Sequence, residues 1–437
     1  MSVKILCNRL TALLVAALYL FLFGIPSVVP AAALADRLSP TLAHTVPPIL
    51  LQSQPMTGSS SMTPPTEILS RLFTDSELQR EWFADSFLAQ ISLAEISQII
   101  QGITGTLGSY QSIEDVDKGF VLTFERGTVP THLALNNQGQ ITGLLFETPQ
   151  LAARPLEEVI AELSALPGEQ HLLMTRSGQP IAAVNADQPL AVGSTFKLLI
   201  LQALQTQIAN GERQWNEVVP LKDEWKSLPS GFLQTWPAGS QMTIETLATL
   251  MISQSDNTAT DHLLNIVGRD VVEALSERNQ PFLTTREAFV LKDPANRNIL
   301  TRWRRSDERH TLLSALAALP LPAVSIFNEG PQAIDVEWFF TARELCEATE
   351  AVADLPLMGI NPGLVDPAAW QKVAYKGGSE PGVENFTTYL VDENGPLCVT
   401  ATWNNEAGID ELRFSTLYRA LIESARQSAD DALIEGQ

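Results

Sequence analysis

Residues 192–201 read VGSTFKLLIL, and this stretch decides how the central part of the chain folds. Apolar side chains continue at helical spacing as far as Ile208, where an Asn-Gly pair ends the pattern. The pattern predicts a helix that is apolar on nearly all sides and is therefore central and buried. Ser194 and Lys197 are three residues apart, so they share one face at the start of this helix.

A lysine at this position requires an explanation. Burial and the positive end of the helix dipole both lower the pKa of the Lys197 ammonium group toward the range useful for a base. A serine hydroxyl within reach of such an amine can become a nucleophile. The alternative is a helix-capping serine beside a solvated lysine, because Ser-x-x-Lys occurs by chance in many chains.

Two further polar segments follow at a distance. Ser255-Asp256-Asn257 forms a polar elbow between helical patterns at 242–252 and 258–267, where it could also simply cap the second helix. Lys376-Gly377-Gly378-Ser379 ends a short predicted strand that begins at Val373. The two glycines would let a substrate backbone approach closely, although the segment alone is also consistent with a strand end or turn.

Taken together, the three segments resemble the signature of class A β-lactamases and penicillin-binding proteins, which is Ser-x-x-Lys, Ser-Asp-Asn and Lys-Thr-Gly in that order. The resemblance covers about residues 155–430. It implies a β-lactamase-like serine hydrolase domain, in which an antiparallel sheet is flanked by helices and carries a helical subdomain. Residues 189–194 and the preceding unit further resemble the two-domain β-lactamase-like proteins of clavulanic acid gene clusters, whose first domain is isomerase-like.

The resemblance implies catalytic roles for four residues. Ser194 would attack a carbonyl carbon and form an acyl-enzyme, while Lys197 takes the serine proton. Ser255, assisted by Lys376, would pass a proton to the leaving nitrogen or oxygen.

The resemblance also implies a substrate-binding set. Asn257 would orient the substrate and the first-motif lysine, and the strand with Gly377 and Gly378 would hold a substrate carboxylate. The backbone N–H groups of Ser194 and Ser379 would form the oxyanion hole. Gly377 departs from the family pattern, because a Thr or Ser hydroxyl that would bond the substrate carboxylate is missing there.

A second departure concerns deacylation. Class A enzymes carry a water-activating Glu roughly 36 residues after the Ser-Asp-Asn serine, a position that falls near Leu291 here, and no Glu-x-x-Leu-Asn stands there. Glu287 and Asp293 are candidates for this base, or else solvated loop acids. We therefore expect slow or differently specific acyl transfer on a β-lactam, a peptidoglycan-type amide or an ester. The alternatives are a non-hydrolysing penicillin-binding or cell-wall ligand-binding protein, and a purely structural pairing of domains.

Composition limits the partners. The chain has 437 residues, 45% of them hydrophobic, which is enough for two cores. A net charge of -22 disfavours nucleic acid and anionic lipid surfaces. The sequence has no CxxC or HExxH, so we expect no metal and no cofactor. The expected partner is a small-molecule or cell-wall peptide substrate, and the oligomeric state stays open.

The N-terminal region predicts export. Residues 1–35 have a positive start, an apolar run and a small-residue cleavage site, as a signal peptide does, although an uncleaved membrane anchor is an alternative. A Pro- and Ser-rich linker is expected over 36–66. Helical patterns followed by short strands then predict a small α+β domain over 67–149. The protein is thus expected in the periplasm or outside the cell, without a stable membrane span once the signal is removed.

The three cysteines of the sequence are predicted to end in different states. Cys7 would leave with the signal peptide. Cys346 lies in a helical pattern and Cys398 in a strand pattern, and both remain in an oxidising compartment where they could pair. We expect two buried free thiols, because the two patterns differ.

Overall fold

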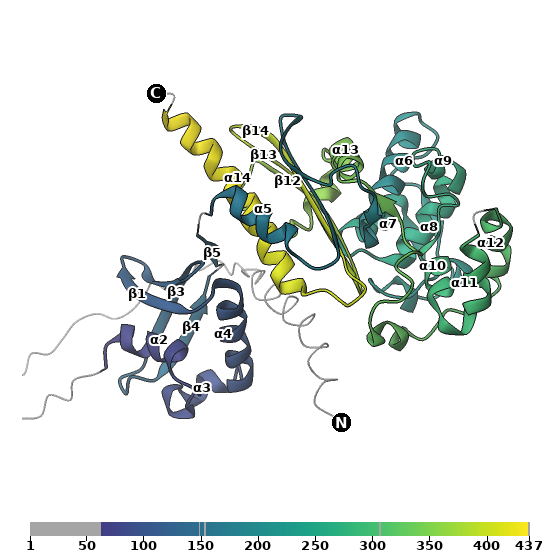
Figure 1. Cartoon of the computed structure of the whole chain (residues 1–437). Coiled ribbons are helices and arrows are strands. Elements are labelled where there is room, and N and C mark those ends of the chain that lie inside the picture. The colour runs from purple at the N-terminus through teal and green to yellow at the C-terminus, as the bar shows by residue number, and fades with distance from the viewer. Residues whose placement is uncertain (1–62, 148, 153, 306, 436–437) are drawn as a thin grey trace, which may run out of the picture. The chain divides into compact units, whose positions relative to one another are not determined.

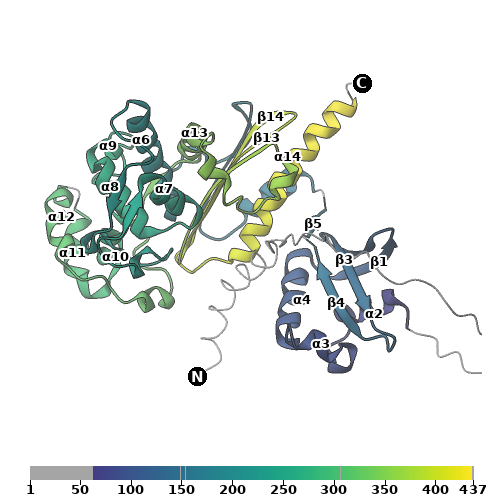
Figure 2. The same cartoon turned by 180° about the vertical axis from the view of Figure 1, so that it is seen from behind.

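The structure is a computed structural model that describes residues 63–435 apart from residues 148, 153 and 306 (Figures 1 and 2). The expected signal peptide and the expected linker up to residue 62 lie outside the described residues. Helix α2 starts at Pro65, slightly before the expected end of the linker. Proline suits this first helical position, since its missing N–H would have no partner within the helix.

The first described region is a small antiparallel sheet with helices and a core of its own. Its strands follow the order β1-β2-β3-β4, and β5 pairs with β3. The elements are α2 (Pro65–Thr74), η1 (Arg80–Trp82), α3 (Asp85–Leu88), α4 (Leu93–Leu107), β1 (Tyr110–Val116), β2 (Gly119–Phe124), β3 (Gly127–Leu135), β4 (Ile141–Phe146) and β5 (Gln150–Leu151). The predicted order of helices followed by strands is confirmed, and the isomerase-like assignment stays a prediction.

A second antiparallel sheet is built from both ends of the remaining sequence. Its order is β12-β13-β14-β6-β7, so β12 is an edge strand. The strands are β6 (Glu169–Arg176), β7 (Gln179–Val184), β12 (Lys372–Glu380), β13 (Val383–Asp392) and β14 (Gly395–Asn404). Two hairpins lie in this sheet, since β6 pairs with β7 and β13 with β14. The central strand β14, from the last part of this region, pairs with β6 from its first part.

Helices cover both faces of this second sheet (Figure 1). Helices α5 (Leu156–Ser164) and α14 (Glu411–Glu435) pack on one face around a buried core that includes Tyr418. The phenol of Tyr418 donates to the carbonyl of Val399 on β14 at 2.8 Å. Helices α13 (Ala342–Val352) and α6 (Lys197–Ala209) lie on the other face.

Between β7 and α13 the chain is mostly helical. The helices are α7 (Ile244–Ser253), α8 (Asn257–Val267), α9 (Arg269–Glu273), α10 (Thr285–Lys292), α11 (Arg297–Trp303) and α12 (Arg309–Ala317). Short strands pair as β8 (Leu190–Ala191) with β11 (Phe339–Phe340), and β9 (Val218–Pro220) with β10 (Gln241–Thr243). Single 3₁₀ turns are η2 (Gly193–Phe196), η3 (Asp223–Trp225), η4 (Leu233–Thr235), η5 (Pro294–Asn296), η6 (Val324–Glu329), η7 (Pro356–Gly359) and η8 (Pro367–Ala369).

The predicted fold class is confirmed: an antiparallel sheet flanked by helices with a largely helical insertion. Helix α6 is buried on nearly all sides, as its composition predicts. Within residues 63–435, no helix combines the length and the apolar character needed to cross a membrane.

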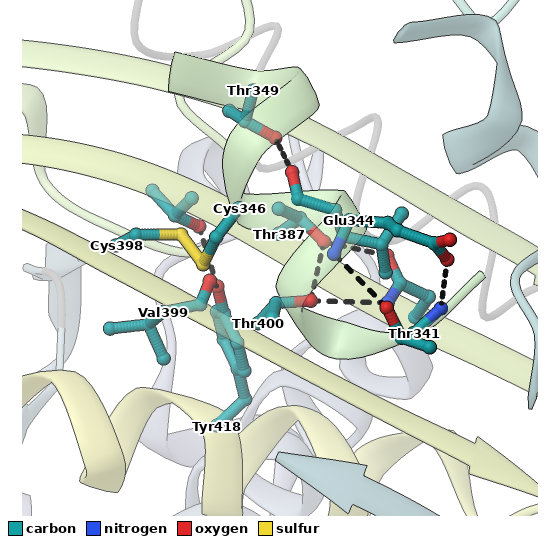
Figure 3. Close-up of a disulfide and its surroundings, with 12 residues drawn as sticks. Thr341, Glu344, Cys346, Thr349, Thr387, Cys398, Val399, Thr400 and Tyr418 are labelled. Carbon is teal, nitrogen blue, oxygen red and sulfur yellow. Dashed lines mark hydrogen bonds between the residues drawn. A yellow bond between two sulfur atoms is a disulfide. The ribbon is translucent and has the colours of Figure 1, made fainter. Parts of the chain in front are cut away.

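The expectation of two free thiols is wrong, because Cys346 and Cys398 form a disulfide (Figure 3). Helix α13 lies on the sheet, so Cys346 faces Cys398 on β14 with a Cα–Cα distance of 5.9 Å. This separation is within the usual range for a disulfide. Helical and strand periodicity assigned each cysteine to its element correctly, but the periodicity carries no information on which faces meet.

Candidate active site

Ser194 lies in the 3₁₀ turn η2 immediately before α6, and Lys197 is the first residue of that helix. The preceding Gly193 has φ of +49°, a left-handed conformation that suits glycine. A Cβ atom on Gly193 would lie 3.1 Å from the backbone nitrogen of Ser379. The turn that carries Ser194 is therefore packed directly against strand β12.

The side-chain nitrogen of Lys197 is fully buried and has three oxygen partners. Its Nζ lies 2.6 Å from the carbonyl oxygen of Ser255, 3.0 Å from Ser255 Oγ and 2.7 Å from Asn257 Oδ1. Burial, and then the positive charge of Lys376, lower the pKa of Lys197 well below its usual range. An amine in this environment can accept a proton near neutral pH.

The elbow at Ser255 has an unusual backbone. Ser255 has φ of +53°, in the left-handed region that residues other than glycine seldom occupy. Its carbonyl oxygen accepts hydrogen bonds from Lys197 Nζ and from Ser230 Oγ at 2.7 Å. These bonds hold the strained residue so that its hydroxyl meets the lysine side chains.

Asp256 supports this elbow from behind. Its side chain accepts a hydrogen bond from the backbone of Ala259 and so caps α8. It also accepts from the backbone nitrogens of Phe232 and Leu233, at 2.7 and 3.0 Å. The capping interpretation therefore holds for Asp256, while Ser255 and Asn257 on either side face Lys197.

Lys376 reaches the same hydroxyl from the sheet. Its buried Nζ lies 3.1 Å from Ser255 Oγ and also donates to the carbonyl of Gly377. Burial lowers the pKa of Lys376 to about 7. Ser255 Oγ thus lies between two buried amines whose proton affinities are both reduced.

Gly378 brings the backbone of β12 against the turn that carries Ser194. A Cβ atom at this position would overlap the carbonyl of Val192 and would lie only 2.5 Å from the backbone nitrogen of Ser194. The next residue, Ser379, is exposed. The expected oxyanion-hole residues, Ser194 and Ser379, are therefore neighbours in space, and all eight residues expected at the site lie on segments that contact one another.

The two expected deacylation bases have local structural partners. Glu287 forms a capping box with Thr284 at the start of α10, and both of its oxygens also accept from Arg269. Asp293 caps η5 by accepting from the backbone of Ala295 at 2.9 Å. Among the described residues, no hydrogen bond joins either carboxylate to the residues that surround Ser255.

A charged cluster at the end of β12 is not apparent from the sequence motifs. Lys292, the last residue of α10, is buried and forms ion pairs with Glu337 and Glu380, and Glu380 directly follows Ser379. Burial alone would lower the pKa of Lys292, but the two carboxylates raise it above its usual range. The sequence signal for this cluster is Lys292 itself, a lysine that directly follows the apolar run at 288–291. The cluster ties the end of β12 next to Ser379 to α10.

A buried hydrogen-bond network that includes Thr195 is also not apparent from the sequence motifs. Thr195 Oγ1 donates to Asn385 Oδ1 at 2.7 Å, and Asn385 Nδ2 donates to Thr402 Oγ1 at 2.7 Å. Thr402 in turn shares a hydrogen bond with His171 Nε2, whose ring is held through Nδ1 by the carbonyl of Gln188. The network couples the residue after Ser194 to three strands of the sheet.

Comparisons with known proteins give one family match and several similar folds. A model of the beta-lactamase enzyme family matches residues 155–319. Similar solved structures include a β-lactamase from Sphaerobacter thermophilus (19% identity, 63% of this chain and 96% of that chain, TM-score 0.45). Others are PBP-A (18%, 63% and 98%, TM-score 0.41) and a class A β-lactamase representative from Bacteroides cellulosilyticus (15%, 63% and 99%, TM-score 0.45). No curated protein matches the chain.

The family match covers the segments with Ser194, Lys197 and Ser255, and the sheet brings Lys376 to them from a distant part of the sequence. Residues 155–319 thus match the beta-lactamase enzyme family, and the larger described region has a β-lactamase-like fold.

Proposed function

We propose that the protein is a serine hydrolase that forms an acyl-enzyme at Ser194 with a β-lactam, a peptidoglycan-type amide or an ester. One observation carries the proposal: the amines of Lys197 and Lys376 both lie within hydrogen-bond distance of Ser255 Oγ, beside the turn that bears Ser194. Buried amines with lowered pKa values serve proton transfer, whereas a structural role alone would favour apolar side chains at these positions.

Acylation begins when Ser194 Oγ attacks the substrate carbonyl carbon and its proton passes to Lys197 Nζ. The carbonyl oxygen then carries a negative charge, which the backbone N–H groups of Ser194 and Ser379 stabilise. Asn257 keeps the lysine amine in position through its 2.7 Å contact. The amine is uncharged before the attack because burial disfavours the ammonium form.

Collapse of the intermediate breaks the bond between the carbonyl carbon and the leaving nitrogen or oxygen. Ser255 donates its hydroxyl proton to that leaving atom and is reprotonated from Lys197, 3.0 Å away. Lys376 stabilises the serine oxygen during the transfer and holds the substrate carboxylate. The acyl group then stays on Ser194 Oγ until water or another nucleophile removes it.

The second candidate function is that of a penicillin-binding protein, which forms the adduct and does not hydrolyse it. Glu287 favours this possibility, since Arg269 and the α10 capping box occupy its oxygens. Slow turnover is therefore the expected behaviour of the acyl-enzyme.

Export is part of the proposal. The Cys346–Cys398 disulfide supports it, because disulfides persist in oxidising compartments. A relation to the two-domain proteins of clavulanic acid gene clusters is also proposed. It is supported by the order of the two described regions, a small α+β region followed by the β-lactamase-like fold.

The test is a time course of intact mass after the purified protein is mixed with a fluorescent penicillin, a chromogenic cephalosporin or a nitrophenyl ester. We expect an adduct that is lost in Ser194→Ala and forms at least 100-fold more slowly in Ser255→Ala, since proton transfer contributes about 10²–10⁴ in rate. Ser86→Ala, an exposed serine of α3, is the matched control. A persistent adduct indicates the penicillin-binding function, and an adduct that forms in Ser194→Ala contradicts the proposed nucleophile.

A further inference from the structure

Residues 227–233 form a segment that lies against the elbow at Ser255. The backbone nitrogen of Asn257 donates to the carbonyl of Ser230 at 3.1 Å. The side-chain Nδ2 of Asn257 donates to the carbonyl of Leu228, also at 3.1 Å. The segment therefore holds both the backbone and the side chain of the residue that ends the elbow.

Gly231 brings this segment against the elbow where there is no room for a side chain. It has φ of +84°, a conformation that glycine adopts at little cost. A Cβ atom there would overlap the carboxylate of Asp256 and would lie 2.5 Å from the Asp256 Cα atom. The backbone of Ser230 is therefore fixed by the close contact of Gly231 and by its own bond to Asn257.

The hydroxyl of Ser230 shares an acceptor with the lysine of the candidate site. Ser230 Oγ donates to the carbonyl of Ser255 at 2.7 Å, and Lys197 Nζ donates to the same oxygen at 2.6 Å. A carbonyl oxygen has two lone pairs, so the two donors use both of them. Ser230 is exposed, but its fixed backbone directs the hydroxyl to this oxygen. A water molecule in its place would have no such anchor.

The two shortest contacts of Lys197 determine which way its amine faces. The carbonyl oxygen of Ser255 and Asn257 Oδ1 can only accept, and they lie 2.6 and 2.7 Å from Nζ. The bond from Asn257 Nδ2 to Leu228 fixes the orientation of that amide. An uncharged amine has two N–H bonds and one lone pair, so the two oxygens take both N–H bonds. The lone pair is left to accept from a hydroxyl, and Ser255 Oγ lies 3.0 Å away.

We propose that Ser230 is a positioning residue for the base Lys197. By donating to the Ser255 carbonyl, its hydroxyl holds that oxygen where it accepts one N–H of the lysine. The lone pair of the amine then points to the hydroxyl from which it takes a proton. The inference rests on the proposed function, in which the proton of Ser194 passes to Lys197. It assigns a role to a residue outside the three motifs.

The first experiment measures adduct formation with a fluorescent penicillin in Ser230→Ala and Ser230→Thr. We expect the acylation rate constant to fall about fivefold to tenfold in Ser230→Ala, as one hydrogen bond is lost, while the Kd of the penicillin is unchanged. Ser230→Thr keeps the hydroxyl and should restore the rate. Ser240→Ala is the matched control, because its hydroxyl also donates to a backbone carbonyl, that of Pro237, at 2.8 Å. An unchanged rate in Ser230→Ala, or no recovery in Ser230→Thr, overturns the inference.

A double-mutant cycle tests whether the effect passes through Lys197. Ser230→Ala should slow the wild type but should not slow Lys197→Ala any further, because no amine is left to orient. A nitrophenyl ester is the substrate, since its good leaving group keeps the residual rate measurable. The same fold-loss in both backgrounds contradicts the claim that Ser230 acts through the lysine.

Crystal structures of the wild type and of Ser230→Ala separate this inference from the proposed function, because they require no reaction. In the variant we expect the 2.6 Å contact between Lys197 Nζ and the Ser255 carbonyl to be lost. An intact contact overturns the role of Ser230, whether or not the wild type forms an adduct. Loss of the contact, in a protein whose wild type forms no adduct, contradicts the proposed acylation alone.

Discussion

Gly378 on β12 leaves no room for a side chain beside the backbone nitrogen of Ser194, which a Cβ atom would approach to 2.5 Å. The other atoms that the Cβ would meet belong to the backbones of Val192 and Gly193, so no side chain can turn away to relieve the overlap. Two segments that are more than 180 residues apart in the sequence are thereby held together. This contact fixes the spacing between the N–H groups of Ser194 and Ser379.

Gly378→Ala should therefore disable acylation. The added methyl group forces β12 away from the Ser194 turn and separates the two proposed oxyanion donors. We expect the rate of adduct formation to fall about 10²- to 10³-fold, the usual cost of losing one donor. Gly102→Ala in α4 is the control, because its Cβ meets no atom within 4 Å. A Gly378→Ala protein that is folded by circular dichroism and acylates normally would contradict the proposed hole.

The lowered pKa of Lys376 predicts a pH dependence. A lysine with a pKa of about 7 is charged below that pH and neutral above it. Since kcat/KM reports ionisations of the free enzyme, this constant should fall above about pH 7 for a substrate with a carboxylate. The methyl ester of the same substrate should show a smaller fall, because Lys376 then acts only on the Ser255 hydroxyl. Lys376→Arg keeps its charge and should lose the falling limb even if the overall rate is lower. A falling limb that persists in Lys376→Arg assigns the ionisation to another group.

The sequence predicted the principal parts of the fold and failed where distant surfaces meet. Periodicity located α6, α7 and α8, because each pattern is local. Strand β1 gives no such signal, since its sequence YQSIEDV is largely polar and its residues are mostly exposed. The pairing of Cys346 with Cys398 and the contact of Lys292 with Glu380 depend on how a helix lies on a sheet or beside it. No local pattern encodes such contacts.

The disulfide should contribute to stability without affecting the chemistry. It joins residues 52 positions apart, and closing a loop of this length in the unfolded chain stabilises a protein by about 2–4 kcal/mol. We expect Cys346→Ser, Cys398→Ser to lower the free energy of unfolding in urea by this amount and to acylate at the wild-type rate. Reduction of the wild type should have the same effect. A loss of acylation in the folded double variant would show that the disulfide positions the site.

Low pH should destabilise the fold through the buried network that joins Thr195 to His171. Burial lowers the pKa of His171 from 6.5 to about 4, so the folded protein holds this ring neutral where the unfolded chain protonates it. The unfolded state then binds more protons between these values, and stability falls as the pH drops through this window, by roughly 3 kcal/mol in all. Urea unfolding at pH 7.5 and pH 4.5 measures the loss. His171→Gln should reduce the difference between the two pH values, and an unchanged difference would assign the loss to other groups.

Once Lys292 is removed, the two carboxylates of Glu337 and Glu380 should make the fold less stable as the pH rises. This is the opposite of the effect expected from His171. Lys292→Met leaves two carboxylates without their partner at the end of β12, and breaking a buried ion pair costs about 3–5 kcal/mol. Burial, followed by the charge of Glu380, raises the pKa of Glu337 in the wild type, and losing Lys292 must raise it further. A carboxyl whose pKa is raised by folding destabilises the fold progressively as the pH rises above about 4.5. Lys292→Met should thus be closest to the wild type in stability near pH 5, and should lose most at pH 8.

The companion variant Lys292→Met, Glu337→Gln removes one of the carboxylates and should recover part of the stability at pH 8. Equal destabilisation of Lys292→Met at both pH values would mean that the carboxylates reach solvent and that the cluster does not fix the end of β12.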